Sequence, residues 1–223
     1  ETIPCQCRGS ILDEAYNWKV VSFPYTKFWN HEEQLAAKID WSSAKIYEKL
    51  DGSLITLYHY DNKWHVSTSG TPDASAEVNG TGKTFAQLFW EVWKELGYEL
   101  PIATDICYMF ELMTPWNRVV VKHSKNRIVH HGARRVVDYM EEYTPGIGKF
   151  IFGWEVAKTY PINNLEDLLK AAKELNPIES EGYIVVDKNS NRVKVKGPAY
   201  VVLHHMIDHM SKRKMLGLIL SGE

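Results

Sequence analysis

A lysine followed by an acidic turn is the segment best suited to covalent chemistry. Lys49-Leu50-Asp51-Gly52-Ser53 joins a polar stretch to an apolar run that starts at Leu54. An amine attacks only when it is unprotonated, and burial beside other cations lowers the pKa of a lysine. Lys194 and Lys196 offer such cations on one face of a strand, because alternate residues of a strand point the same way. Together these lysines could hold a triphosphate. Taken alone, the Lys49 to Gly52 pattern is more simply explained as a hairpin turn at the Asp-Gly pair.

The elements that must position these side chains are mostly strands. Alternating apolar and polar residues predict strands over 9–12, 18–23, 54–58, 64–67, 106–112, 118–121, 127–131, 149–155, 182–187 and 192–196. A helix is predicted after Thr84, which can form a capping box with Gln87. Two more helices are predicted, one after Asn164 and one after Pro198. Because strands come in runs with separated helices, we expect an α+β fold of mainly antiparallel sheets.

The composition is that of a folded globular protein. Of the 223 residues, 44% are hydrophobic and 24% are charged, and the net charge of −2 argues against a surface coated in positive charge. A local basic groove remains compatible with that sum. The sequence shows neither a signal-peptide pattern nor an apolar run long enough for a membrane span, so we expect a cytoplasmic protein. Cys5, Cys7 and Cys107 are expected to be reduced thiols.

The order of the motifs along the chain resembles that of the covalent nucleotidyltransferase superfamily, which comprises ATP-dependent DNA ligases, RNA ligases and mRNA capping enzymes. These enzymes share a KxDG lysine, a central acidic motif, an EG motif and a KxK motif in that sequence. Here the order reads Lys49 to Gly52, Phe110-Glu111, Glu181-Gly182 and Lys194 to Lys196.

Within that superfamily the chain looks like the bacteriophage RNA ligase 1 type from about Cys7 to His205. Further matching segments are Cys7-Arg8-Gly9, Pro24 to Asn30, Thr114-Pro115, Asn117 to Val120, Tyr183, Tyr200-Val201 and Leu203-His204. The resemblance implies a nucleotidyltransferase (ligase adenylation) fold. It also implies ATP as a substrate, Mg²⁺ or Mn²⁺ as the metal, and the sealing of RNA 5′-phosphate ends to 3′-hydroxyl ends, in the context of RNA repair.

The resemblance also implies a role for each matching residue. The catalytic group would be Lys49 as the adenylylated amine, Glu111, Glu181, and Lys194 and Lys196 as stabilisers of charge on the α-phosphate. Glu111 and Glu181 would hold the metal, largely through water. The ATP-binding residues would be Arg8, Lys27, Glu48, Lys49, Gly52, Ser53, His131, Ile184 and Tyr200. Adenine would lie between Ile184 and the His130-His131 strand end, with the Glu48 to Lys49 backbone reading its edge.

Two positions depart from the family pattern. Ser69, ahead of Gly70, stands where the family has a lysine, so one phosphate contact is missing. His130 and His131 replace apolar residues beside the adenine and would bring pH dependence. No C-terminal specificity domain or OB-fold is evident, so we expect a single nucleotidyltransferase domain over residues 1–223 that acts as a monomer.

Other patterns have simpler interpretations. Gly80-Thr81-Gly82-Lys83-Thr84 resembles a phosphate-binding loop, but Glu77 stands where that motif needs glycine, so a loop and helix cap are expected. His205 and His209 have metal-ligand spacing without a third ligand, which favours packing or surface histidines. Lys212-Arg213-Lys214 could meet RNA phosphates or be a solvated helix end. The aromatic residues Phe89, Trp90 and Trp93 at helical spacing are expected in the core.

Three functions follow from the sequence. The first is an RNA ligase that carries AMP on Lys49, passes it to an RNA 5′-phosphate and seals the end with a 3′-hydroxyl. The second is another polynucleotide enzyme of the superfamily, a DNA ligase or a GTP-using capping enzyme. The third is an RNA-binding relative without catalysis, against which the joint presence of Lys49, Glu111, Glu181, Lys194 and Lys196 argues. A virus-encoded protein acting in the host cytoplasm would fit the first.

Overall fold

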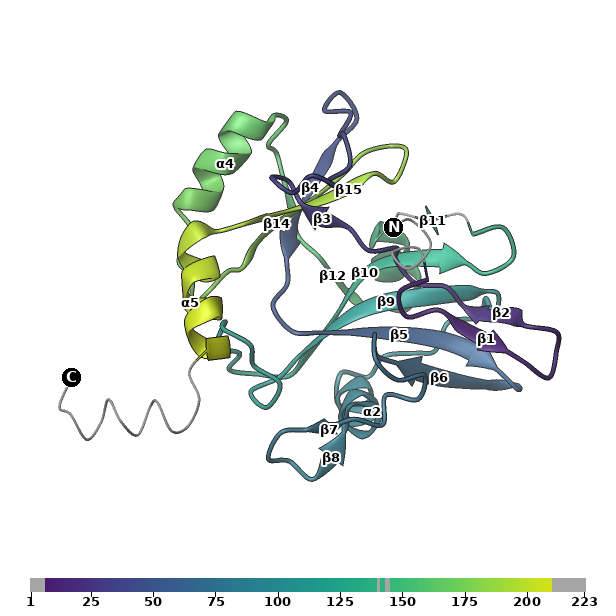
Figure 1. Cartoon of the computed structure of the whole chain (residues 1–223). Helices are drawn as coiled ribbons and strands as arrows, with labels where there is room; N and C mark the ends of the chain where they lie inside the picture. Colours follow the sequence, from purple (N-terminus) through teal and green to yellow (C-terminus); the bar gives the residue numbers. More distant parts are fainter. Residues whose placement is uncertain (1–6, 140, 143–144, 210–223) are drawn as a thin grey trace.

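The computed structural model describes residues 7–139, 141–142 and 145–209, and it contains two large β-sheets with helices on their outer sides (Figure 1). The larger sheet, of six strands in this part of the chain, has the order β11-β10-β9-β5-β6, and β12 pairs with β10. Its strands are β5 (Ser53–Tyr60), β6 (Lys63–Ser67), β9 (Ile106–Met113), β10 (Arg127–Arg135), β11 (Glu141–Glu142) and β12 (Glu155–Val156).

The smaller sheet, of five strands among the described residues, has the order β13-β4-β14-β15-β3. Its strands are β3 (Trp29–Asn30), β4 (Lys45–Lys49), β13 (Thr159–Tyr160), β14 (Gly182–Val186) and β15 (Arg192–Lys196). Two short hairpins, β1 (Ile11–Asp13) with β2 (Lys19–Ser22) and β7 (Glu77–Val78) with β8 (Lys83–Thr84), lie outside these sheets. The helices are α2 (Phe85–Glu95), α3 (Pro145–Phe152), α4 (Leu165–Lys173) and α5 (Pro198–His209). The expected α+β class with mainly antiparallel pairing is confirmed.

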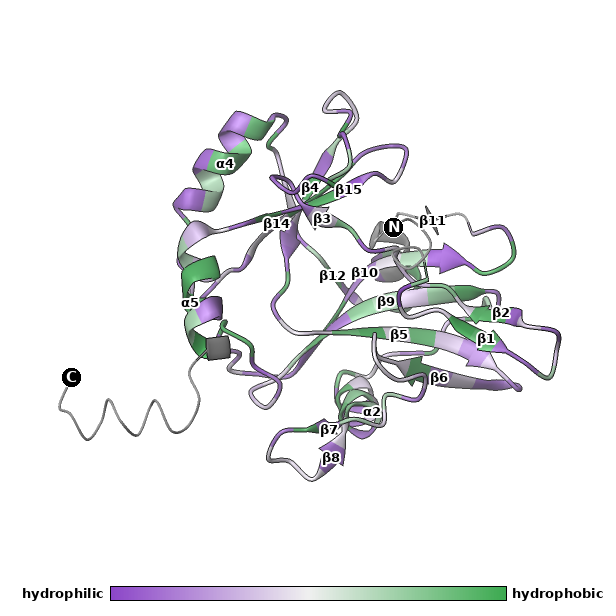
Figure 2. Ribbon diagram, in the orientation of Figure 1, coloured by the Kyte–Doolittle hydropathy of each residue, from purple (hydrophilic) through white to green (hydrophobic). Residues whose placement is uncertain are grey.

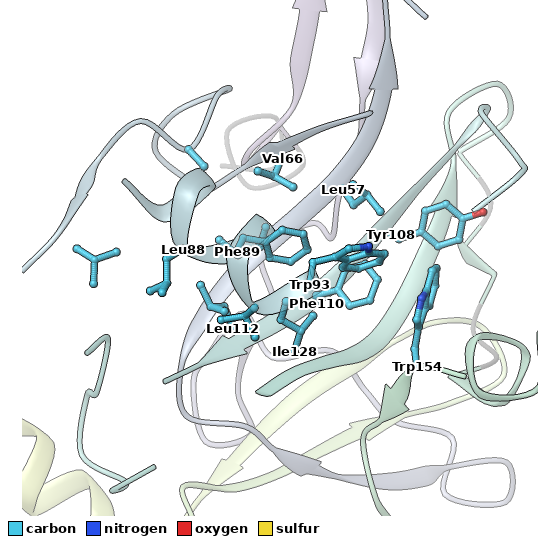
Figure 3. Packing of buried hydrophobic residues seen from close by; sticks show 14 of the residues in the cluster. Leu57, Val66, Leu88, Phe89, Trp93, Tyr108, Phe110, Leu112, Ile128 and Trp154 are labelled. Atoms are coloured by element: carbon cyan, nitrogen blue, oxygen red, sulfur yellow. The ribbon is translucent and has the colours of Figure 1, made fainter. Parts of the chain in front are cut away.

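Helix α2 covers one face of the larger sheet and builds an aromatic core with it. Phe89 and Trp93 from the helix pack against Phe110 and Trp154, and the Trp93 and Phe110 ring centroids lie 5.5 Å apart (Figure 3). The predicted capping box is present: the Thr84 hydroxyl accepts the Gln87 N–H, and the Gln87 side chain accepts the Thr84 N–H. The core interpretation of Phe89 and Trp93 is therefore confirmed, with Trp90 packed at the edge of the cluster.

Helix α4 covers the outer face of the smaller sheet. Leu168 and Ala172 of the helix pack against Ile46, Val185 and Val193. Asn164 caps the helix by accepting the N–H of Asp167, as predicted. Figure 2 shows both hydrophobic and hydrophilic residues on α4, as expected for a helix with one face on a sheet and the other in solvent. The alternate residues of β4, β14 and β15 are thereby free to face the other way.

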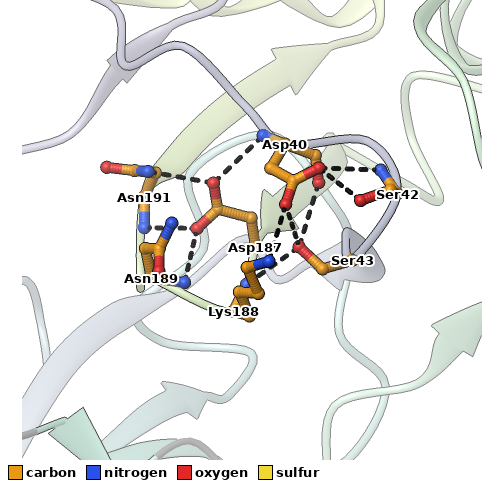
Figure 4. Close-up of polar contacts among 7 residues, drawn as sticks. All are labelled: Asp40, Ser42, Ser43, Asp187, Lys188, Asn189 and Asn191. Atoms are coloured by element: carbon orange, nitrogen blue, oxygen red, sulfur yellow. Dashed lines mark hydrogen bonds and ion pairs between the residues drawn. The ribbon is translucent and has the colours of Figure 1, made fainter.

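The hairpin between β14 and β15 is held by the carboxylate of Asp187. It accepts hydrogen bonds from the backbone N–H groups of Asp40, Asn189 and Asn191 and from the Asn191 side chain (Figure 4). Burial alone would raise the pKa of Asp187, but these hydrogen bonds outweigh it and lower that pKa. The turn is thus fixed to the 40–43 segment, which limits how far β15 can move.

Two predicted strands were wrong. Residues 118–121 form no strand, because the N–H groups of Val120 and Val121 donate to the Asp51 carboxylate instead of to a neighbouring strand. Most of 149–155 is helix α3, and only Glu155 begins a strand. A short apolar run such as Phe150 to Phe152 does not separate helix from strand by its periodicity. Strand β4 was missed because its residues are mainly polar.

The C-terminal helix and the thiols can be compared directly with the expectations from the sequence. The helix after Pro198 is confirmed as α5. Cys7 and Cys107 are free thiols, and Cys5 lies outside the described residues. None of the helices in the described part of the chain has the length and apolar character needed to cross a bilayer.

Truncation of the aromatic core should destabilise the fold strongly. Phe89 is fully buried, whereas Phe150 is 91% exposed, so the two phenylalanines form a matched pair. We expect Phe89→Ala to lower the free energy of unfolding by about 3–5 kcal/mol, through lost burial and a residual cavity. Phe150→Ala should change it by less than about 0.5 kcal/mol. Urea denaturation measures both, and equal effects would contradict the assigned core.

Candidate active site

A cleft of about 340 Å³ is lined by residues of both large sheets. The smaller sheet contributes Tyr47, Lys49, Ile184, Arg192 and Lys194; the larger sheet contributes Leu54, Thr56, Glu111 and His131; and Arg8 enters from the N-terminal segment. The connection from β4 to β5, which contains Leu50 and Gly52, runs along it. The cleft therefore gathers residues that are far apart in the sequence.

The carboxylate of Glu181 joins two lysines beside this cleft. Lys49 Nζ lies 2.5 Å from Glu181 Oε2, and Lys196 Nζ lies 3.0 Å from Glu181 Oε1. The strand register causes this meeting, because Gly182 pairs with Lys49 on β4 and with Lys196 on β15. The side chain of Glu181 is only 5% exposed, so both contacts form largely out of water.

Lys194 completes a cluster of cations at the cleft. Burial lowers its pKa, the charges of Lys49, Lys196 and Arg8 lower it further, and Glu33 opposes them. Such mutual influence requires the four cations to lie close together. A region where positive charges repel one another in a half-buried cleft favours an anionic ligand, above all a polyphosphate.

Asp51 fastens the turn that follows Lys49. Its buried carboxylate accepts the N–H groups of Val120 at 2.9 Å and Val121 at 2.6 Å and the hydroxyl of Tyr200 at 2.9 Å. A Cβ atom at Gly52 would overlap the carbonyl of Leu112, which explains the small residue after Asp51. The KxDG segment is thus a close-packed joint between the two sheets and more than a simple hairpin.

A bulge in β10 separates the two histidines beside the cleft. The register of β10 against β9 shifts between His130 and Gly132, so that His131 faces the cleft and His130 faces the aromatic core. The Tyr25 ring stacks on His131 with centroids 5.6 Å apart, and its hydroxyl donates to the His131 carbonyl. His131 Nε2 lies 3.7 Å from a carboxylate oxygen of Glu111. Only one of the two predicted histidines can therefore meet a ligand.

The other predicted site residues fall into two groups. Those that line the cleft are Arg8, Glu48, Lys49, Gly52, Glu111, His131, Ile184 and Lys194, with Ser69 at the departing position. Five others do not line it. Glu181 and Lys196 lie beside it, in contact with each other, and the remaining three have other partners. Lys27 is exposed with its Nζ 3.6 Å from the centroid of the Trp29 ring, the Ser53 hydroxyl accepts a hydrogen bond from Asn117, and Tyr200 bonds Asp51. Their roles toward ATP stay predictions.

Sequence reasoning missed Arg192. This buried arginine lines the cleft, and its guanidinium carbon lies 4.2 Å from the centroid of the Tyr25 ring. It precedes Lys194 by two residues on β15 and so shares its face. The two-residue spacing from Lys194 was the sequence signal that could have predicted a place for Arg192 in the cleft.

The acidic residues suit a metal held mainly by water and phosphate. No group of three or more acidic, histidine or cysteine side chains within the described residues could bind a metal ion on its own. Glu111 and Glu181 could each hold a hydrated Mg²⁺, which keeps several waters and binds substrate phosphates. The His205/His209 hypothesis gains no support, since the side chain of His209 lies outside the described residues, as do Lys212 to Lys214. Residues 80–84 form a turn and the cap of α2, as expected.

Comparison with known proteins identifies the class and then the family. The fold matches that of an archaeal ATP-dependent RNA ligase, with a TM-score of 0.56, 12% identity, and coverage of 78% of this chain and 48% of that one. It also matches the RNA ligase of Naegleria gruberi in a structure with PPi, with a TM-score of 0.53, 12% identity, and coverage of 86% and 67%. These likenesses define a nucleotidyltransferase fold.

A family model described as RNA ligase matches residues 6–200, and the chain belongs to this family. The chain is 28% identical to an RNA ligase of Rhodothermus phage RM378 over 282 aligned positions, which cover 97% of this chain. It spans 64% of the length of that relative.

Burial of His130 should make the fold sensitive to acid. Neither ring nitrogen makes a hydrogen bond of ordinary geometry within the described residues. Burial, followed by the nearby His131, outweighs a backbone contact with Gly132 and lowers the pKa of His130 from 6.5 to about 3. The folded state therefore binds fewer protons than the unfolded state between these values. The contribution of neutral His130 to the free energy of unfolding is complete above pH 6.5 and is lost as the pH falls toward 3.

His130→Phe should remove this dependence, because the ring would join Phe110 and Trp154 without a titrating group. Urea denaturation between pH 4 and 7 should show a slope for the wild type that exceeds that of the variant by up to about 1.4 kcal/mol per pH unit. Parallel pH profiles would contradict the prediction.

Proposed function

We propose that this chain is the adenylyltransferase part of an ATP-dependent RNA ligase, which joins RNA 5′-phosphate ends to 3′-hydroxyl ends through a lysyl-AMP intermediate. The observation that carries the proposal is the Lys49-Glu181-Lys196 contact beside a cleft that gathers Lys194, Arg8 and Glu111. Membership in the RNA ligase family supports it.

In this proposal Lys49 is the nucleophile. Its Nζ attacks the α-phosphorus of ATP as the neutral amine. A phosphoamide N–P bond forms, the nitrogen releases one proton to solvent, and pyrophosphate leaves with the electron pair of the broken P–O bond. Lys194 and Lys196 stabilise the negative charge that builds on the phosphate oxygens during this step. Glu181 orients both Lys49 and Lys196, because its two carboxylate oxygens contact one amine each.

The remaining residues of the cleft are proposed to bind the rest of the nucleotide. Adenine lies against Ile184 and His131, which both line the cleft. The N–H of Glu48 already donates to the carbonyl of Lys158, so an adenine contact in this segment would come from another backbone group. Arg8 grips a phosphate, and Glu111 contacts the ribose or the hydrated metal. A divalent cation, when bound, neutralises phosphate charge.

The choice of ATP and a divalent metal follows relatives of the same fold. Structures of the Naegleria gruberi RNA ligase include a K170A mutant with ATP and Mn at a TM-score of 0.50 and an E312A mutant with AMP and Mn at 0.51. We propose the same nucleotide and a Mg²⁺ or Mn²⁺ ion for this chain. A GTP-using capping-type enzyme is one alternative, and labelling from GTP instead of ATP would identify it. A DNA ligase is the other; it would also take label from ATP but would pass AMP to DNA 5′-phosphate ends and not to RNA ends.

The nucleophile can be identified by covalent labelling. Wild-type protein incubated with labelled ATP and Mg²⁺ should keep the label through denaturing electrophoresis, and Lys49→Ala should keep none. Lys45→Ala is the matched control, because Lys45 is an exposed lysine on the same strand. It should label at the wild-type level. Label taken from GTP and not from ATP would contradict the assignment of ATP as the substrate. Labelling of Lys49→Ala would contradict the assignment of Lys49 as the nucleophile.

The negative charge of Glu181 should be needed for a fast transfer of label to the protein. Glu181→Gln keeps the shape but removes the anion between two lysines, so we expect the rate of label transfer to fall at least about 100-fold, equivalent to about 2.7 kcal/mol. Glu179→Gln, two residues earlier and exposed, serves as the comparison. A Glu181→Gln protein that is as fast as the wild type at every Mg²⁺ concentration would refute the role given to Glu181.

A further inference from the structure

A second cleft adjoins the nucleotide cleft and shares Glu48, Lys49 and Leu50 with it. This second cleft has a volume of about 420 Å³ and also reaches Glu181, the partner of Lys49. A ligand in it would therefore lie next to the amine that carries AMP. Of the residues assigned to ATP and its metal, only Glu48, Lys49 and Glu181 reach this second cleft.

The cations that line the second cleft differ in whether they already have a partner. Arg127 is paired with Glu155, with 2.5 Å between nitrogen and oxygen. By contrast, Lys122, Lys125 and Lys158 are exposed, and no ion pair links them to any of the described residues. These three ammonium groups are available to an anion from solvent.

The carboxylates of the same cleft are largely engaged. Glu181 is held by Lys49 and Lys196, and a carboxylate oxygen of Glu48 accepts the N–H of Lys158 at 3.0 Å. Glu179 is exposed at the rim. Glu155 is paired with Arg127, and the Asp51 carboxylate accepts backbone N–H groups and the Tyr200 hydroxyl. Among the described residues, the three lysines are thus the unpaired cations of a lining that also contains carboxylates.

The segment that carries two of these lysines is tied to the KxDG turn. Val120 and Val121 donate to the Asp51 carboxylate, and His123 Nε2 lies 2.6 Å from the Asp51 carbonyl oxygen. Lys122 and Lys125 therefore keep a fixed position relative to Lys49. Trp116, earlier in the same segment, is 60% exposed but does not line this cleft.

We propose that the second cleft binds the sugar-phosphate backbone of the single RNA strand whose 5′-phosphate accepts AMP from Lys49. The inference rests on the proposed ligase function and adds the path of its RNA substrate. Separate, solvated ammonium groups spread along a groove match successive phosphates of a strand, whereas a protein partner would need an apolar centre. A metal ion is not favoured, since no three-ligand group occurs within the described residues.

The test compares the triple variant K122A/K125A/K158A with the control K19A/K63A/K94A, which removes three exposed lysines that do not line either cleft. Both should label with ATP at the wild-type level, because neither changes a side chain of the proposed ATP site and the contacts of Lys158 with Glu48 use the Lys158 backbone, which the substitution keeps. Binding of a 5′-phosphorylated single-stranded RNA is then measured by fluorescence anisotropy over a series of salt concentrations.

We expect the cleft variant to bind this RNA at least about 10-fold more weakly than the control and to transfer less AMP to it. The slope of log K against log salt should be shallower by about 2, because each lost phosphate contact on a single strand contributes about 0.7. K122R/K125R/K158R should restore both, since arginine keeps the charge.

Equal RNA affinity and equal salt slopes for the cleft variant and the control would overturn the assignment of this cleft. That result is distinguishable from failure of the proposed function, in which the wild-type protein itself would take no label from ATP. A cleft variant that loses a protein partner but keeps full RNA binding would likewise overturn it.

Discussion

The site depends on one buried carboxylate that must lie between two amines. Glu181 can do so only because Gly182, the next residue, pairs with both Lys49 and Lys196 on neighbouring strands. Gly182 has a φ of +150°, and a Cβ there would overlap the carbonyl of Val195, so a larger residue would push the strands apart. Electrostatic attraction alone would not offset the cost of removing these three charged side chains from water. The register of the sheet holds them.

Each of the two sheets that line the cleft has its own hydrophobic core. The larger sheet packs against α2, and the smaller packs against α4, so each sheet has one apolar face satisfied. The other faces carry the cations and carboxylates of the site together with smaller apolar clusters, one that includes Met113 and Val129 and one that includes Tyr25 and Met109. Asp51 links the two units at the β4 to β5 connection. The near-neutral total charge of −2 thus hides a strong local concentration of positive charge.

Features that depend on a few neighbouring residues were predictable from the sequence. The caps of α2 and α4 each involve residues three apart, and both are present as expected. The paired strands β14 and β15 also follow from local alternation. The failures occur where distant partners decide. Within residues 118–121, Val120 and Val121 donate their N–H groups to Asp51, about 70 residues earlier in the chain, instead of to a neighbouring strand.

The types and order of the reactive residues were determined by the sequence itself: an amine at Lys49, carboxylates at Glu111 and Glu181, and a second pair of amines on one strand face. Only the tertiary structure decided which neighbours share the cleft. It brought in Arg192, kept Ser53 and Tyr200 away from the cleft, and turned His131 toward the cleft while burying His130. The physical reason is that a bulge, a strand register or the facing of two sheets depends on pairing between segments that are remote along the chain.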